Sequence, residues 1–330
     1  MKSLLLICSV FITALTACHH SSTNATTKQT QPNNIQPTPV KAQQYLVVLG
    51  IAQDAGYPQA GCTKNCCKDV WQNTHKKKLA VSLGVIDQQE GKKWMIEATP
   101  DFREQLQVLN KFQASESMLP QGIFLTHGHI GHYSGLIHLG REAMGAQGVA
   151  VYVMPRMRQY LTNNGPWSQL VSLKNIYLQP IQADSSFQLS QQIQITPIQV
   201  PHRDEFTETV GYQIKGSKKT VLFIPDINKW QKWELKLTEV IKTIDIALID
   251  GTFYKNGEIA NRDMSQIPHP FVEETTALLK DIPASEKSKV YFIHFNHTNP
   301  LINPGSKERK EVNKQGFNIA QEGQIIRLDQ

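Results

Sequence analysis

Apolar runs rich in β-branched residues recur along the chain, with more polar, helix-like segments between them. The runs predict β-strands at residues 45–49, 80–86, 94–96, 122–125, 149–153, 193–200, 210–214, 220–224, 246–249 and 290–293. The intervening segments predict helices at residues 101–112, 135–144, 155–161, 230–241, 271–279 and 306–313. The strands come in two batches, each followed by helices. This order favours an α/β fold in which two sheets pack face to face with helices outside, a four-layer αββα sandwich.

The first 43 residues have a different pattern. Lys2 precedes an apolar stretch that ends in small residues at Cys18, as in a secretory signal peptide. Residues 15–18 resemble a bacterial lipobox, whose cysteine becomes the lipidated N-terminus, and a plain cleaved signal is the alternative. We expect a signal peptide at residues 1–17, a lipidated Cys18 with a polar tether through residue 43, and a folded domain at residues 44–330.

The residue after the lipobox cysteine bears on location. His19 stands where an Asp would retain a lipoprotein at the inner membrane, so the outer membrane is favoured. We therefore expect the protein to be lipid-anchored in the bacterial envelope and to face the periplasm, with its N-terminal lipid as the membrane contact. Beyond the signal, no apolar stretch reaches the roughly 20 residues of a membrane-spanning helix.

The composition is that of a folded protein with one large domain or two small ones. Of 330 residues, 40% are hydrophobic and 19% are charged, which excludes a disordered chain or a small disulfide-stapled scaffold. The net charge is +6, from 34 Lys and Arg against 28 Asp and Glu, and the one dense basic run covers residues 76–78. We therefore expect no nucleic-acid partner.

A histidine motif follows the predicted strand at residues 122–125. His127, His129 and His132 form the pattern H-x-H-x-x-H in the loop after this strand. Loops at the end of a sheet are common positions for binding sites, and the alternating His127 and His129 can present two imidazoles to one ion. The motif predicts a metal site.

Three single residues further along the chain would complete such a site. His202, Asp226 and His294 each come just after an apolar strand. Neutral imidazole and carboxylate are the ligands that borderline divalent metals prefer. Each residue alone has an ordinary structural explanation, but their repeated placement at strand ends favours one shared metal centre.

These residues resemble the metallo-β-lactamase superfamily, whose signature is H-x-H-x-D-H followed by a separate His, an Asp and a last His. The resemblance covers residues 44–330. Within the superfamily, the chain is similar to the pyrroloquinoline quinone biosynthesis protein B family and its relatives through residues 49–54, 58–59, 97–101, 250–253 and 293–300.

The resemblance implies two active-site zinc ions, with iron or manganese as alternatives. By this resemblance, the first ion would be held by His127, His129 and His202, and the second by His132, His294 and the bridging Asp226. Gly131 stands where the superfamily has Asp. We expect the glycine to leave room beside the metal and the second site to be weak or absent, so that Gly131→Asp would raise its occupancy. Whether Asp54 or Asp101 compensates is left open.

Cys62, Cys66 and Cys67 form a cluster in a Gly-rich loop. An odd, clustered trio favours a metal site, with a disulfide from Cys62 to one of the others, or buried free thiols, as alternatives. The cyclic phosphodiesterases of phosphonate breakdown are similar, because they pair a cysteine trio with a His three places after the last catalytic ligand, here His297. This resemblance implies a structural zinc of Cys₃His type.

His269 lies between Asp250 and His294 in the chain. Phosphodiesterase members of the superfamily often carry a His in this interval that can protonate a leaving oxygen, and an exposed position in the Pro-flanked loop is the alternative. Asp250 would orient the metal shell through hydrogen bonds or cap a turn.

These features predict a metal-dependent hydrolase with a small-molecule substrate on an exported lipoprotein. A divalent ion lowers the pKa of its bound water from about 15.7 to about 7, and the hydroxide would attack a phosphodiester or related ester. Asp226 would hold the metal and the water, and His269 or a metal-bound water would assist the leaving group. Two other functions remain open. The quinone-biosynthesis relatives imply an iron-dependent oxygenase, against which the exported location argues, and Gly131 allows a non-catalytic lipoprotein that only holds metal.

Overall fold

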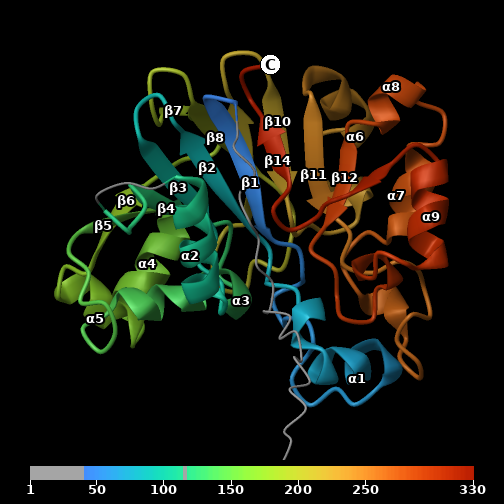
Figure 1. Cartoon of the computed structure of the whole chain (residues 1–330), viewed down its shortest axis with the longest axis horizontal. Helices are drawn as coiled ribbons and strands as arrows, with labels where there is room; N and C mark the ends of the chain where they lie inside the picture. The colour runs from blue at the N-terminus through green and yellow to red at the C-terminus, as the bar shows by residue number, and fades with distance from the viewer. Residues whose placement is uncertain (1–40, 114–116) are drawn as a thin grey trace, which may run out of the picture. The chain divides into compact units, whose positions relative to one another are not determined.

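The computed structural model describes residues 41–113 and 117–330 (Figure 1). The predicted signal peptide, the lipidated Cys18 and the tether as far as residue 40 lie outside the described residues. At the start of the described part, Ala42 is buried, and the backbone N–H of Gln43 donates to Asp329 Oδ2 over 2.6 Å. None of the helices within residues 41–113 and 117–330 has the length and apolar character needed to cross a membrane.

Two mixed seven-stranded sheets run through the described residues. In spatial order, the first sheet consists of β14 (Ile325–Arg327), β1 (Gln44–Gly50), β2 (Ser82–Asp87), β3 (Lys92–Ile96), β4 (Gly122–Phe124), β5 (Val149–Val153) and β6 (Ile176–Pro180). The second consists of β13 (Asn318–Ile319), β12 (Val290–Ile293), β11 (Ile246–Asp250), β10 (Thr220–Ile224), β9 (Val210–Lys215), β8 (Gln194–Gln199) and β7 (Phe187–Gln188).

Helices cover the outer face of each sheet. Figure 1 shows α2, α4 and α5 beside the first sheet, and α7 and α9 beside the second. The α-helices of the described residues are α1 (Asn65–Gln72), α2 (Phe102–Phe112), α3 (Ile130–Tyr133), α4 (Pro155–Asn163), α5 (Trp167–Ser172), α6 (Leu237–Val240), α7 (Val272–Leu278), α8 (Ala284–Lys287) and α9 (Lys307–Lys314). The predicted αββα sandwich is confirmed.

Strand β1 shows why the sheets are covered on both faces. Leu46 and Val48 belong to the large apolar cluster that fills the space between the sheets. Tyr45, Val47 and Leu49 belong to a second cluster, which joins the first sheet to α2, α4 and α5. Successive side chains of a strand point to opposite faces, so a strand that is apolar at every position is buried on both sides.

Two predicted helices are wrong in form. The segment at residues 135–144 is a 3₁₀-helix at Ser134–Leu139 followed by turns. A Cβ at Gly135 would lie 2.1 Å from the carbonyl oxygen of Thr99, so the backbone packs too closely here for an ordinary amphipathic helix.

The segment at residues 230–241 is broken into 3₁₀ turns and the four-residue α6. Two buried indoles hold the break, because Trp230 Nε1 donates to Thr275 Oγ1 over 2.9 Å and Trp233 Nε1 donates to the Gln199 carbonyl over 3.1 Å. Tertiary hydrogen bonds of this kind override a helical pattern. The sequence patterns also did not predict α1, α3, α5, α8 or β6, nor the short strands β7, β13 and β14.

The topology brings the chemically interesting strand ends to one edge. Strands β10, β11 and β12 are parallel neighbours, and β8 runs in the same direction because β9 is antiparallel to both β8 and β10. In the first sheet, β3, β4 and β5 are parallel neighbours. Carboxyl ends of parallel strands share an edge, which is where α/β sheets build their sites.

Candidate metal centre

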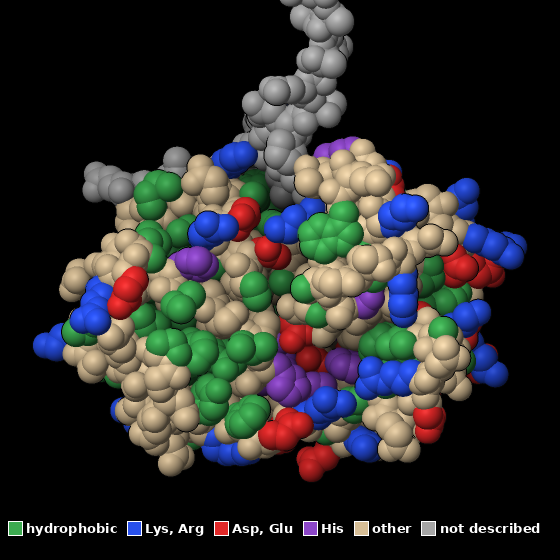
Figure 2. Space-filling model, turned by 90° about the horizontal axis from the view of Figure 1, so that it is seen from below, with side chains coloured by type: hydrophobic (Ala, Val, Ile, Leu, Met, Phe, Trp, Pro, Cys, Tyr) green, Lys and Arg blue, Asp and Glu red, His purple; other side chains and the backbone are tan. Residues whose placement is uncertain are grey.

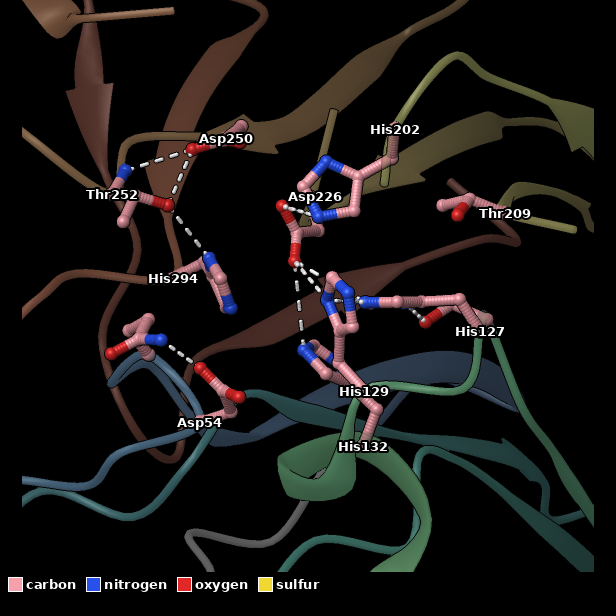
Figure 3. Close-up of polar contacts among 12 residues, drawn as sticks. Asp54, His127, His129, His132, His202, Thr209, Asp226, Asp250, Thr252 and His294 are labelled. Carbon is pink, nitrogen blue, oxygen red and sulfur yellow. Dashed lines mark hydrogen bonds and ion pairs between the residues drawn. The ribbon is translucent and has the colours of Figure 1, made fainter. Parts of the chain in front are cut away.

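Six side chains singled out by the sequence meet at the shared edge of the two sheets. They come from the loop after β4, from α3, and from the ends of β8, β10 and β12. Figure 3 shows them around a common centre: His127, His129, His132, His202, Asp226 and His294. The structure therefore brings together the whole predicted active-site set.

The carboxylate of Asp226 lies at the middle of this group. Its Oδ2 atom is 3.4 Å from His127 Nε2, and its Oδ1 atom is 3.2 Å from His202 Nε2. His129 Nδ1 lies 2.9 Å from His127 Nε2. Two ligand atoms of a tetrahedral zinc with bonds of about 2.0–2.1 Å are about 3.3 Å apart, so these separations are compatible with one shared ion.

Burial and neighbouring charges set the protonation of these groups. Burial holds the pKa of His127 well below its ordinary value and lowers the pKa of His294 to about 4. Burial alone would raise the pKa of Asp226, but the His202 and His269 rings hold it well below its usual range. Neutral imidazole and ionised carboxylate are the forms that bind a metal.

His132 and His294 complete the cluster. Their Nε2 atoms are buried and have no hydrogen-bond partner among the described residues. His132 Nε2 is 3.8 Å from Asp226 Oδ2, and Asp54 offers a carboxylate oxygen within 4.8 Å of a ring nitrogen of each histidine. Buried polar atoms without partners are costly unless something binds them. The donor set therefore fits the divalent ions that the histidine motif implies.

Hydroxyl groups orient two of the imidazole rings. Thr126 Oγ1 lies 2.8 Å from His127 Nδ1, and Thr252 Oγ1 lies 2.8 Å from His294 Nδ1. Because Nδ1 of each ring contacts a hydroxyl group, the Nε2 atom of each ring is the one that faces the middle of the cluster. Outer partners of this kind fix the tautomer and the direction of a metal ligand.

Glu97 has the corresponding position behind His132, a role that the sequence did not predict. Its wholly buried Oε2 atom is 3.5 Å from His132 Nδ1, and its Oε1 atom accepts the backbone N–H of Thr126 over 3.2 Å. Burial opposes protonation of His132, but the charge of Glu97 outweighs burial and raises the pKa of the ring to about 9. A metal ion that binds this ring must therefore displace a proton. The available signal was a carboxylate directly after an apolar strand.

Two residues of the site have strained backbone conformations. Glu97 has φ +79° and His294 has φ +68°, in the left-handed region that non-glycine residues seldom adopt. Such conformations cost about 1–3 kcal/mol each and persist only where the surroundings impose them. Here they place His294 at the centre and Glu97 behind His132.

His269 lies inside the site rather than on an exposed loop. Its Nδ1 atom is 2.8 Å from Asp250 Oδ2 and 3.1 Å from Asp226 Oδ1. Burial opposes protonation, but Asp226 and Asp250 raise the pKa of the ring to about 9. Asp250 is itself buried and accepts hydrogen bonds from Thr252 Oγ1 over 2.7 Å and from the Thr252 N–H over 2.8 Å, so it orients this part of the site.

The expectation that Gly131 leaves room beside the metal is wrong. An ideal Cβ at Gly131 would lie 1.8 Å from the Cβ of Asp54. The space is filled, so Gly131→Asp has no room for its side chain while Asp54 is in place. Asp101 plays no part here, because its Oδ2 atom accepts the N–H of Ala80 over 2.9 Å and its Oδ1 atom pairs with Lys77 over 3.2 Å.

The cysteine trio forms a second cluster with His297. The ligand atoms of Cys62, Cys66, Cys67 and His297 all lie within 4.8 Å of one another. All three cysteines are free, and Cys62 Sγ is 3.7 Å from Cys66 Sγ. A disulfide bond is about 2.05 Å long, whereas two thiolates on one tetrahedral zinc lie about 3.8 Å apart. His297 Nδ1 is buried without a partner in the described part of the chain.

A pocket of about 670 Å³ opens onto the histidine cluster. Figure 2 shows histidine and acidic side chains in a hollow on this face, with hydrophobic side chains beside them. His129, His202, Asp226 and His269 line the pocket from within. Its remaining walls include the aromatic residues Tyr133, Tyr160, Phe206 and Phe253 and the exposed Arg203 and Arg262. The site is therefore open to a ligand with both anionic and apolar parts.

The model of the beta-lactamase superfamily domain matches residues 93–295. The chain belongs to this superfamily. Its fold and its histidine–carboxylate cluster are those of a metallo-hydrolase, and the predicted superfamily is confirmed.

Curated relatives extend this similarity beyond the matched domain. Coenzyme PQQ synthesis protein B of Xanthomonas axonopodis pv. citri is 24% identical over 312 residues, which cover 86% of this chain and 99% of that protein. The protein of the same name from Pseudomonas putida is 26% identical over 309 residues, covering 86% of this chain and 100% of that protein.

Two solved structures have the same fold. Zinc-bound PqqB from Methylobacterium extorquens is 22% identical with a TM-score of 0.72, covering 86% of this chain and 99% of that chain. A diphosphatase of the PhnP family is 21% identical with a TM-score of 0.59, covering 86% of this chain and 96% of that chain. Similarity to both groups of proteins is thus as expected from the sequence.

Proposed function

We propose that the protein is a metal-dependent hydrolase that cleaves phosphodiesters or related esters of small molecules. The observation that carries the proposal is the pocket, in which a metal-binding cluster, a candidate proton donor and two arginines face the same space. The likeness to a diphosphatase of the PhnP family agrees with it.

The ligand set defines what each residue does. A divalent ion, zinc in the first instance, would supply Lewis acidity and a hydroxide nucleophile at neutral pH. His127, His129 and His202 would hold one ion, and Asp226 would bridge to a second ion near His294. His269 would act as general acid, because its Nδ1 is anchored by Asp250 and its other nitrogen is left for the leaving oxygen.

The pocket wall supports an anionic substrate. Arg203 and Arg262 line it, and both are exposed. Guanidinium groups bind phosphate oxygens with paired, charge-assisted hydrogen bonds. The aromatic wall formed by Tyr133, Tyr160 and Phe206 would then contact the organic part of the ester.

Activity assays test this proposal. The protein is stripped of metal, reloaded with zinc or manganese, and assayed with bis(p-nitrophenyl) phosphate, p-nitrophenyl phosphate and p-nitrophenyl acetate. We expect the diester to be the preferred substrate and its turnover to need metal. Turnover of the acetate alone would contradict the phosphodiester assignment, and absence of any turnover with metal bound would favour the non-catalytic, metal-holding lipoprotein.

A second candidate is an iron-dependent oxygenase, favoured by the curated relatives named coenzyme PQQ synthesis protein B. Metal analysis of protein purified in air and without oxygen separates the two functions. Zinc or manganese with ester turnover supports the hydrolase. Iron that is accompanied by oxygen consumption supports the oxygenase.

The cysteine cluster is proposed to hold a structural zinc ion. The Sγ–Sγ distance of 3.7 Å and the unpartnered His297 Nδ1 support a Cys₃His site. Four protein ligands close a tetrahedral zinc, which leaves no position for a substrate. We therefore assign this ion to folding and the ions at the histidine cluster to chemistry.

The proposed location is the bacterial envelope, with the lipid of Cys18 as anchor and the domain facing the periplasm. The lipobox-like residues 15–18 and the polar segment after them support it. Cell fractionation of the wild type and of Cys18→Ser tests it. We expect the wild type in the membrane fraction, the outer membrane more than the inner, and the variant in the soluble fraction. Equal solubility of the two would contradict the anchor.

A further inference from the structure

The space next to Gly131 is occupied by a carboxyl group from elsewhere in the chain. An ideal Cβ at Gly131 would lie 1.8 Å from Asp54 Cβ and 2.8 Å from Asp54 Cγ. A side chain at residue 131 and the side chain of Asp54 would therefore compete for one volume. The signature H-x-H-x-D-H can therefore lack its carboxylate at residue 131 and still have a carboxyl group, that of Asp54, in the same place.

The loop that carries Asp54 is fixed to the strand end that carries His294. The Gln53 N–H donates to the Phe295 carbonyl over 2.8 Å, and the Phe295 N–H donates to the Ile51 carbonyl over 2.9 Å. These backbone hydrogen bonds hold the loop against the residue that follows His294. Asp54 is thus placed relative to a candidate ligand by the fold itself.

The carboxylate is also oriented. Gln53 Nε2 donates to Asp54 Oδ1, and Gln53 Oε1 accepts from Asn296 Nδ2 over 3.3 Å. The second carboxylate oxygen, Oδ2, has no hydrogen-bond partner within residues 41–113 and 117–330. Figure 3 draws a contact to only one of the two carboxylate oxygens of Asp54.

Two buried nitrogens face the same point. His132 and His294 each have an Nε2 atom that is buried and lacks a hydrogen-bond partner in the described part of the chain. Asp54 and these two histidines form a group whose potential ligand atoms lie within 4.8 Å of one another. A carboxylate and two buried imidazole nitrogens that lack hydrogen bonds are a sound ligand set for zinc or manganese.

We propose that Asp54 supplies the carboxylate ligand of the second metal ion, in place of the Asp that the superfamily carries at the position of Gly131. The centre is then binuclear, and the second ion is held by Asp54, His132, His294 and the bridging Asp226. This inference rests on the metal-binding part of the proposed function and is independent of hydrolysis.

Metal counting tests the inference. Wild-type protein, Asp54→Ala and Glu205→Ala are loaded with zinc and dialysed, and bound zinc per chain is measured by elemental analysis and by calorimetric titration. Glu205 is the matched control, because its half-exposed carboxylate lies 3.4 Å from His129 Nε2 but belongs to no ligand cluster. Zinc at the cysteine cluster is common to all three proteins and cancels in the comparison.

We expect the wild type and Glu205→Ala to bind one zinc ion more than Asp54→Ala. The affinity for the second ion should fall at least about 100-fold in Asp54→Ala, because loss of an outer partner of a metal ligand alone lowers metal affinity 10–100-fold. Equal zinc content of wild type and Asp54→Ala would overturn the inference, whether that content is one active-site ion or two. Asp54→Asn, which keeps the shape and removes the charge, covers the case in which Asp54→Ala does not fold.

A substitution at Gly131 also tests the position of the Asp54 carboxylate. In Gly131→Ala, the added Cβ must displace Asp54, so this protein should lose the second ion as Asp54→Ala does. Retention of both active-site ions by Gly131→Ala would contradict the proposed position of the carboxylate. Because these measurements record bound zinc, an inactive protein with two active-site ions would contradict the hydrolase and leave Asp54 supported.

Discussion

The protein has two candidate metal clusters, and they are built in opposite ways. The histidine cluster collects its ligands from strand ends of both sheets and lines a pocket. The cysteine cluster takes Cys62, Cys66 and Cys67 from one loop and the first turn of α1, and only His297 from a distant segment. The first mixes nitrogen and oxygen ligands, as catalytic sites do, and the second is rich in sulfur, as structural sites are.

The two clusters are nonetheless connected through the chain. His297 follows His294 in one loop, and the loop with Asp54 continues into the segment with Cys62. A zinc ion on the cysteines would therefore hold together the two loops that carry second-ion ligands. On the proposed assignment, an ion at the cysteines would stabilise the framework on which binding of the second ion depends.

The largest expected effect is the loss of the cysteine cluster. Structural zinc supplies roughly 10–16 kcal/mol of apparent binding free energy, which matches or exceeds the whole stability of an ordinary domain, about 5–15 kcal/mol. Cys66→Ser should lower the melting temperature far more than His129→Ala. Thermal unfolding of both variants measures this, with Asn65→Ser as a control in the same helix.

A disulfide found by mass spectrometry in the metal-loaded protein would contradict the structural zinc. So would a melting temperature of Cys66→Ser equal to that of the wild type. Either result would contradict a structural role for the cysteine cluster beside a catalytic role for the histidine cluster.

The next largest effect concerns Asp226. Its carboxylate contacts His127, His202 and His269, so Asp226→Ala should remove the proposed bridging ligand. Metal assistance is worth several kcal/mol in the transition state, and kcat should fall at least about 1,000-fold. Steady-state kinetics with the zinc-loaded variant measure the loss, and zinc at the cysteines should stay bound. Near-normal kcat would place the chemistry elsewhere.

A smaller effect is expected for Glu97→Gln, which keeps the shape of the side chain and removes its charge. Glu97 acts through His132 as a positioning residue, so zinc affinity at the histidine cluster should fall about 10–100-fold. Competition with a chelator measures the affinity. The position of Glu97 predicts no change in zinc at the cysteines, and equal weakening of both clusters would indicate a general loss of structure.

The smallest effect is expected at the rim of the pocket. Arg203→Ala and Arg262→Ala remove exposed cations, and solvent screening limits what each contributes. KM for a phosphodiester should rise about fivefold, that is by about 1 kcal/mol, with kcat nearly unchanged. Kinetics with a neutral ester provide the control, because its KM should not move. An equal rise for both substrates would argue against phosphate recognition.

Much of this site follows from the sequence because its ligands stand at strand ends. A histidine or aspartate after an apolar run is visible in the chain, and parallel strands bring such positions to one edge. His127, His202 and His294 were found in this way. The cysteine cluster was found because its three thiols are close in sequence.

The roles of Asp54 and Glu97 could not be predicted from their positions in the sequence. Asp54 was one of two possible substitutes for the carboxylate missing at Gly131, and Glu97 directly follows an apolar run. No spacing rule links either carboxylate to its neighbour, Gly131 or His132, far along the chain. The breaks at residues 134–139 and 230–243 had the same cause, since contacts of Gly135 and of two buried indoles with distant segments decide the local backbone. Sequence patterns report local periodicity, and these features depend on tertiary packing.

Phosphodiester turnover without molecular oxygen, in water enriched in heavy oxygen, separates hydrolysis from oxygenation. A metal-dependent hydrolase takes the new oxygen of its product from water, so we expect an unchanged rate without molecular oxygen and one heavy oxygen atom in the phosphoryl product. Turnover that requires molecular oxygen and iron, with no label from water, would contradict hydrolysis and establish oxygenase chemistry at the histidine cluster.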